Sequence, residues 1–178
     1  MEKRDYTKAE LDCTPRTTEE IVKTPDDVLE RMKKTVEAEG PIRESLLVKR
    51  VLNSYDLYRN GCILSPFLSE VLGKIETPVT VDGDGGRVFH TGGNEDYFRP
   101  TPEGETRYSY QIPYSEAANC LLYIMERSEK NSYTKSELYR LFLSEMGYLK
   151  SGDKVEKLFE GALSDSRIKR SGNGRILK

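Results

Sequence analysis

The chain has 178 residues, of which 36% are hydrophobic and 33% are charged, and its formal net charge at pH 7 is −2. This length suits one larger domain or two small ones, and the near-neutral charge excludes a wholly basic nucleic-acid-binding domain. No apolar run approaches the roughly 18 residues that span a bilayer, and the charged N-terminus does not resemble a signal peptide. We therefore expect a cytoplasmic protein without a membrane partner.

Side chains suited to catalysis or metal binding are few and scattered. The three cysteines, Cys13, Cys62 and Cys120, are odd in number and far apart, which suits ordinary thiols in a reducing compartment. His90 is the single histidine, so a zinc site or a Ser-His-Asp triad has little to draw on. We predict no catalytic residue, no metal site, no cofactor and no small-molecule substrate.

The first part of the chain predicts a polar lead and then three helices. Residues 1–25 contain two prolines and few large apolar side chains, so we expect a poorly packed lead. A helix is predicted from about Asp26 to Glu39, where Gly40-Pro41 ends it. After a brief extended contact at Ile42, two further helices are predicted, over about 44–54 and 65–73.

A β-hairpin is predicted after the third helix. Val79–Val81 and Arg87–His90 are short β-type runs on either side of Asp82–Gly86, which is a turn by composition. The turn begins like a calcium-binding loop, but its sixth position is Arg87 instead of glycine and its twelfth is Gly93 instead of glutamate. We interpret it as a simple turn. Three helices followed by a hairpin are the layout of a winged helix.

The second half of the chain repeats this plan. Residues 92–111 are rich in Gly, Pro and charge, and we interpret them as a linker. The unit over 112–178 then has predicted helices at about 114–129, 135–146 and 152–164, and a hairpin closes the chain. The expected fold class is mainly α with small β-hairpins (α+β), in two tandem winged-helix (helix-turn-helix) units over 26–91 and 112–178.

An internal repeat supports the two-unit interpretation. Ser136–Asp165 aligns with Ser45–Lys74 at an offset of 91 without a gap, and both carry apolar residues at i, i+3, i+4, i+7 and i+8. Near the ends of the units the offset falls to 88, so the second hairpin region is predicted to be three residues shorter.

Four stretches of the chain together resemble one protein family. They are "EGPIRESLLVKRVLNSYDLYRNG" (Glu39 to Gly61), Phe98-Arg99-Pro100, Ile112-Pro113 with Glu116, and "ELYRLFLSEMGYLKSG" (Glu137 to Gly152). They resemble domain-of-unknown-function family 3320, the tandem winged-helix-like C-terminal domain of large bacterial superfamily-one helicase/Vsr-like nuclease fusion proteins. The resemblance covers about residues 25–178 and implies helicase or nuclease domains as partners, in cis or in trans. The chain itself has no Gly-x-x-x-x-Gly-Lys-Ser/Thr phosphate loop.

Basic residues gather toward the C-terminal end. Residues 112–178 carry 12 Lys and Arg against 9 Asp and Glu, whereas residues 1–111 carry 16 against 21. The predicted nucleic-acid-binding residues are Lys150, Lys154, Lys157, Arg167, Lys169, Arg170, Arg175 and Lys178. Such a hairpin can lie along a phosphate backbone. The alternative is a solvated edge hairpin whose cations block strand pairing.

Two further features bear on nucleic-acid binding. Neither predicted third helix exposes an Arg, Asn or Gln that could contact base edges, so we expect no sequence specificity. The tyrosines of the predicted linker region, Tyr97, Tyr108, Tyr110 and Tyr114, could stack on bases. We favour the alternative, in which they pack the linker against the adjoining domain.

These observations predict a non-catalytic accessory DNA-binding domain of a helicase/nuclease-type protein, which contacts the DNA backbone without sequence specificity. The alternative prediction is a protein–protein docking module that binds no nucleic acid, which the acidic first unit favours.

Overall fold

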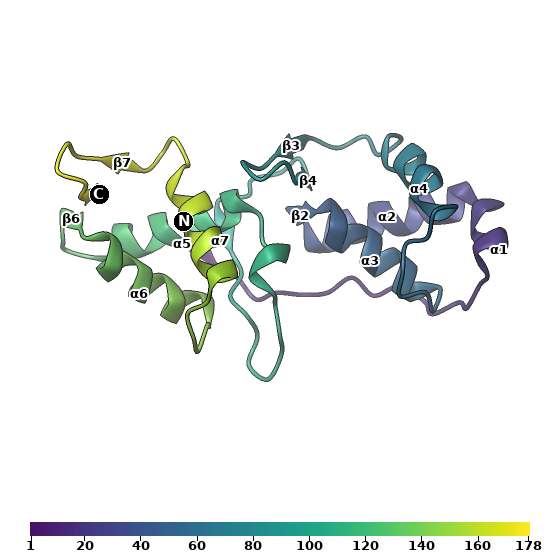
Figure 1. Ribbon diagram of the computed structural model, residues 1–178, viewed down its shortest axis with the longest axis horizontal. Helices are drawn as coiled ribbons and strands as arrows, with labels where there is room; N and C mark the ends of the chain where they lie inside the picture. Colours follow the sequence, from purple (N-terminus) through teal and green to yellow (C-terminus); the bar gives the residue numbers. More distant parts are fainter. The chain divides into compact units, whose positions relative to one another are not determined.

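The computed structural model describes residues 1–178 and divides into two compact units (Figure 1). The N-terminal unit comprises residues 7–81 and 86–93, and the C-terminal unit comprises residues 1–6, 82–85 and 94–178. Seven α-helices and three small sheets confirm a mixed α+β class. None of the helices combines the length and apolar character that a bilayer span requires.

The N-terminal unit builds its core from four helices and a small antiparallel sheet. The helices are α1 (Thr18–Val22), α2 (Pro25–Glu39), α3 (Glu44–Ser54) and α4 (Leu64–Leu72). The strands are β2 (Ile42–Arg43), β3 (Val79–Val81) and β4 (Arg87–Phe89), in the order β2-β4-β3. Val28, Met32 and Val36 recur at helical spacing on α2 and are buried.

Gly40, the residue that follows α2, has no room for a side chain. A Cβ added at Gly40 would lie 2.6 Å from the carbonyl oxygen of Val36 and 2.7 Å from the side chain of Thr91. Only glycine fits this close approach, and the chain then passes into β2.

The C-terminal unit has the same plan with an added parallel strand pair. Its helices are η1 (Ser109–Gln111, 3₁₀), α5 (Tyr114–Arg127), α6 (Lys135–Met146) and α7 (Asp153–Leu163). Strands β6 (Ser132–Tyr133), β7 (Lys169–Arg170) and β8 (Ile176–Leu177) form an antiparallel sheet in the order β6-β8-β7. Strand β1 (Glu2–Lys3) pairs in parallel with β5 (Tyr97–Phe98).

The two units share both the order of their elements and the connectivity of their sheets. The last strand lies in the middle of each three-stranded sheet: Phe89 pairs with Ile42 and Val79, as Leu177 pairs with Ser132 and Lys169. The second copy is three residues shorter, as predicted. The hairpin itself accounts for two residues of this difference, and the segment before the hairpin accounts for one.

Residues 1–25 are better packed than the sequence predicted. Ile21 on α1 is fully buried, and the Thr14 amide donates a 2.8 Å hydrogen bond to the Ser54 carbonyl. Thr17 caps α1, because its hydroxyl accepts from the Glu20 amide while the Glu20 carboxylate accepts from the Thr17 amide. Most of this segment therefore belongs to the N-terminal unit.

The predicted linker over 92–111 is also part of a unit. From Asn94 onward these residues belong to the C-terminal unit, where Phe98, Arg99 and Arg107 are buried. Both segments also contain arginines that pair with a carboxylate: Arg16 with Asp27, and Arg99 and Arg107 with Glu116.

Candidate nucleic-acid interface

Helix α7 presents three different sides. Leu158, Phe159, Ala162 and Leu163 are buried in the core of the C-terminal unit. Asp153, Glu156, Lys157 and Glu160 line an open groove of about 550 Å³, together with residues of α6. Lys154 lies on the third side, with its ammonium nitrogen 5.1 Å from the centroid of the Tyr110 ring. Lys154 and Lys157 therefore face different surroundings.

The closing hairpin is fixed by its turn and by an apolar anchor. The Ser171 amide donates to the Arg175 carbonyl at 2.9 Å, and Gly174 adopts φ 77° in the turn. Ile176 on β8 and Ile168 just before β7 are both buried in the core of this unit. Lys169 and Arg170 on β7 are exposed.

The hairpin cations differ in their partners. Arg167 forms a two-pronged ion pair with Asp165, with distances of 2.9 and 2.8 Å, and this contact lowers the pKa of the Asp165 carboxyl. Arg170 donates to the Leu163 carbonyl at 3.1 Å and Arg175 to the Ser132 hydroxyl at 2.9 Å. Lys178 donates to the Ser128 carbonyl at 2.7 Å. Only Arg167 forms an ion pair with an acid, whereas Arg175 interacts electrostatically with Glu137 without an ion pair.

The remaining predicted lysines have no acidic partner. Lys150, Lys157 and Lys169 are exposed and form no ion pair. Lys150 and Lys154 lie at the start of α7, whereas the hairpin follows its end (Figure 1). An 11-residue helix is about 16 Å long, so α7 separates two groups of predicted basic residues: a hairpin group, Arg167, Lys169, Arg170, Arg175 and Lys178, and a helix-start group, Lys150 and Lys154. Lys157 belongs to neither group, because it lines the groove beside the acids of α7.

A buried carboxylate was not assigned any role from the sequence. Glu116 on α5 accepts hydrogen bonds from Arg99 and Arg107, and each of the two guanidiniums reaches it at 2.8 Å. Arg107 also donates to the Arg99 carbonyl. Burial raises the pKa of Glu116, but Arg107 and Arg99 outweigh it and hold that pKa at about 2. The ring of Tyr6 lies against both guanidiniums.

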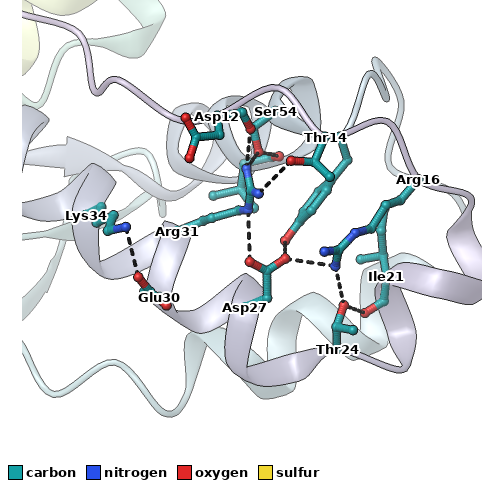
Figure 2. Close-up of polar contacts among 12 residues, drawn as sticks. Asp12, Thr14, Arg16, Ile21, Thr24, Asp27, Glu30, Arg31, Lys34 and Ser54 are labelled. Carbon is teal, nitrogen blue, oxygen red and sulfur yellow. Dashed lines mark hydrogen bonds and ion pairs between the residues drawn. The ribbon is translucent and has the colours of Figure 1, made fainter.

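The N-terminal unit contains a matching centre (Figure 2). Asp27 on α2 forms ion pairs with Arg16 at 2.9 Å and Arg31 at 3.3 Å, and it accepts a 2.7 Å hydrogen bond from the Tyr55 hydroxyl. Arg31 also reaches the Asp12 carbonyl and the hydroxyls of Thr14 and Ser54. Burial raises the pKa of Asp27, but the contacts with Tyr55 and the two arginines outweigh burial. The pKa of Asp27 is therefore lower than its ordinary value.

These two centres hold the chain together. Each carboxylate is ionised at neutral pH because its pKa is lowered, and its oxygens already accept hydrogen bonds from the surrounding donors. A carboxylate in this state is a poor proton donor or acceptor near pH 7. Each centre instead fastens an irregular segment, residues 12–16 or 99–107, to the first long helix of its unit.

Comparison with known proteins gives no relative. No protein-family model, no curated protein and no solved structure matches the chain. The resemblance to the helicase-associated family stays a prediction.

Proposed function

We propose that the chain is a non-catalytic module of two tandem winged-helix units, whose C-terminal unit binds the phosphate backbone of DNA without sequence specificity. The hairpin group is the observation that carries this proposal. It holds five cations, of which only Arg167 forms an ion pair with an acid. In the proposed setting the module positions a helicase or nuclease domain on DNA.

The shared topology supports the winged-helix assignment. Each unit has three main helices, a short strand between the first two, and a closing hairpin whose last strand lies in the middle of the sheet. In this arrangement the hairpin is the wing, and Ile168 and Ile176 are its apolar anchors in the helical core.

The donors of the hairpin suit phosphate better than bases. A guanidinium has five N–H donors, and Arg170 uses only one of its nitrogens within the chain. Arg175 is held by the hydroxyl and carbonyl of Ser132, so less side-chain entropy is lost when it binds an anion. The charged α7 side chains along the groove are three acids and Lys157, so the groove offers no Arg, Asn or Gln for a bidentate contact with a base edge.

Fluorescence anisotropy of the full chain with labelled duplex, forked and single-stranded DNA tests this proposal. We expect duplex binding at about 50 mM salt that weakens steeply by about 200 mM, because bound phosphates release counterions. Lys169→Glu should weaken duplex binding, since Lys169 is exposed and its replacement disturbs no internal contact. Lys33→Glu makes the same charge change at an exposed site on α2 and should leave binding unchanged. Absent or salt-independent binding would contradict the proposal.

A protein-docking module is the second candidate, and the groove between α6 and α7 favours it. Tyr139 and Phe159 line that groove beside Asp153, Glu156 and Glu160, and these acids oppose phosphate but suit a partner of mixed charge. Reversing the charge of Arg170 and Arg175 separates the candidates. Lost DNA binding with retained partner binding supports the first, and retained DNA binding with lost partner binding supports the second.

A further inference from the structure

Two tyrosines form an exposed aromatic pair on the C-terminal unit. The rings of Tyr108 and Tyr110 are stacked, with centroids 5.3 Å apart and an angle of 19° between their planes. Their exposed fractions are 50% and 46%. Of the tyrosines that the sequence left open to two interpretations, Tyr97 and Tyr114 pack inward, and this pair does not.

The backbone that carries the pair is firmly supported. Ser109 and Gln111, which alternate with the two tyrosines, are buried, and Ile112 is completely buried. Farther along, the ring of Tyr114 lies directly on α7, where a Cβ on Gly161 would approach it to 2.5 Å. The two rings are therefore presented to solvent from a rigid base, and little ordering is needed before a flat ligand can stack on them.

A positive charge lies beside the rings. The Lys154 ammonium is 5.1 Å from the centroid of Tyr110 and has no acidic partner. Lys154 and Gly161 are seven residues apart, so they lie on the same side of α7. The acids of α7 line the groove on another side. The acids nearest to the rings along the chain are Glu103 and Glu105, in the loop that precedes Arg107.

We propose that Tyr108, Tyr110 and Lys154 form a binding site for an unpaired nucleotide of single-stranded nucleic acid. The base stacks on the outer face of the tyrosine pair, and the Lys154 ammonium contacts the adjacent phosphate. Stacking on aromatic side chains accepts any base, because every base has a π-face, and the lysine supplies charge complementarity to the backbone. This site is separate from the hairpin group, and the inference does not rest on duplex binding by the hairpin.

Binding of the full chain to three labelled oligonucleotides of equal length tests the proposal. Oligo(dT) and oligo(rU) carry bases, whereas an abasic oligonucleotide presents only the sugar-phosphate chain. We expect oligo(dT) or oligo(rU) to bind at about 50 mM salt and the abasic chain to bind at least about 5-fold more weakly, since each stacked base contributes that much or more. A preference between dT and rU identifies the source of the strand.

Ring removal provides the second arm of the test. Tyr108→Ala and Tyr110→Ala should each weaken oligonucleotide binding by about 5- to 100-fold, whereas Tyr108→Phe and Tyr110→Phe keep the rings and should bind within about 3-fold of the parent. Tyr58→Ala is the matched control, because Tyr58 is 76% exposed in the N-terminal unit. Lys154→Gln should lower the slope of log K against log salt by about one.

The outcomes separate this inference from the proposed function. Lys169→Glu should weaken duplex binding and spare oligo(dT) binding, and Tyr108→Ala should do the reverse. Three results would each overturn the inference: the abasic chain binds as tightly as the others, neither base-carrying strand binds, or binding survives removal of both rings. The ring pair would then be a surface for a protein segment. Circular dichroism of each variant confirms that the fold is retained.

Discussion

The two arginine–carboxylate centres occupy equivalent places in the two units, yet they are buried to different degrees. Asp27 is the third residue of α2 and Glu116 is the third residue of α5. Each binds two arginines, and in each centre both guanidiniums lie against one tyrosine ring, Tyr55 or Tyr6. However, the Asp27 side chain is 34% exposed and that of Glu116 is 0% exposed.

This difference determines how much each centre contributes to stability. Water screens the charges around Asp27, so its ion pairs contribute modestly. Glu116 and its arginines have lost their hydration almost completely, and the pair remains favourable only while every charge keeps its partner. Removing either carboxylate therefore tests the same architecture at two levels of solvent exposure.

The largest expected effect is that of Glu116→Gln. This substitution keeps the shape of the side chain but leaves Arg99 and Arg107 buried without a counter-charge, so we expect a loss of about 3–5 kcal/mol in the free energy of unfolding of the C-terminal unit. Urea unfolding with hydrogen exchange of the α5 amides measures it. Glu129→Gln makes the same change at an exposed site near the end of α5 and should have almost no effect. A loss below about 1 kcal/mol for Glu116→Gln would contradict this account.

Acid should produce the next largest effect, in the same unit. The pKa of Glu116 in the folded chain is about 2, below the value near 4.3 in an unfolded chain. A lowered pKa stabilises the fold above the unfolded value, and this contribution is lost as the pH falls through the folded value. We expect stability to fall by about 3 kcal/mol between about pH 5 and pH 2. Urea titrations at several pH values measure this loss, and in Glu116→Gln most of the dependence should disappear.

Asp27→Asn should have a smaller effect, confined to the N-terminal unit. The amide can still accept a hydrogen bond from Tyr55 but no longer balances Arg16 and Arg31, and partial exposure limits the cost to about 1 kcal/mol. Asp26→Asn is the matched control, since Asp26 lies one residue earlier, is exposed and has no partner. Thermal unfolding compares the two variants. Equal midpoints would show that the Asp27 centre contributes nothing beyond its position near the start of the helix.

The sequence predicted the elements that depend on apolar spacing and turn residues. The paired helices α3 and α4, their counterparts α6 and α7, and both hairpins lie where periodicity and glycine-rich turns indicated. These features are local, so a short window of sequence contains the information that specifies them.

The segments before each first helix could not be predicted in this way. Arg16, Arg99 and Arg107 look like solvated residues of a lead or a linker, because nothing nearby in the sequence reveals their carboxylate partners. Arg107 and Glu116 are nine residues apart, and Arg99 and Glu116 are 17 apart. Glu116 was noticed only as part of a family resemblance, and the one further signal was its place in the first turn of a predicted helix.

The sequence named the basic residues of the candidate site but did not predict how they lie relative to one another. The hairpin cations lie on one hairpin as expected, but the length of α7 separates them from Lys150 and Lys154. Neither Asp165 as the partner of Arg167 nor the stacking of Tyr108 on Tyr110 follows from spacing alone, since both depend on how the chain folds back.

The outer strands of the two hairpins have opposite consequences for self-association. Strand β3 ends its sheet with Val79 and Val81 exposed, so its free backbone groups are flanked by apolar side chains that favour pairing with another strand. Strand β7 ends the other sheet with Lys169 and Arg170, and two like charges repel an identical strand from a second molecule. At high protein concentration, edge-to-edge aggregation should therefore begin at β3, whereas the edge of β7 should stay unpaired with a second molecule.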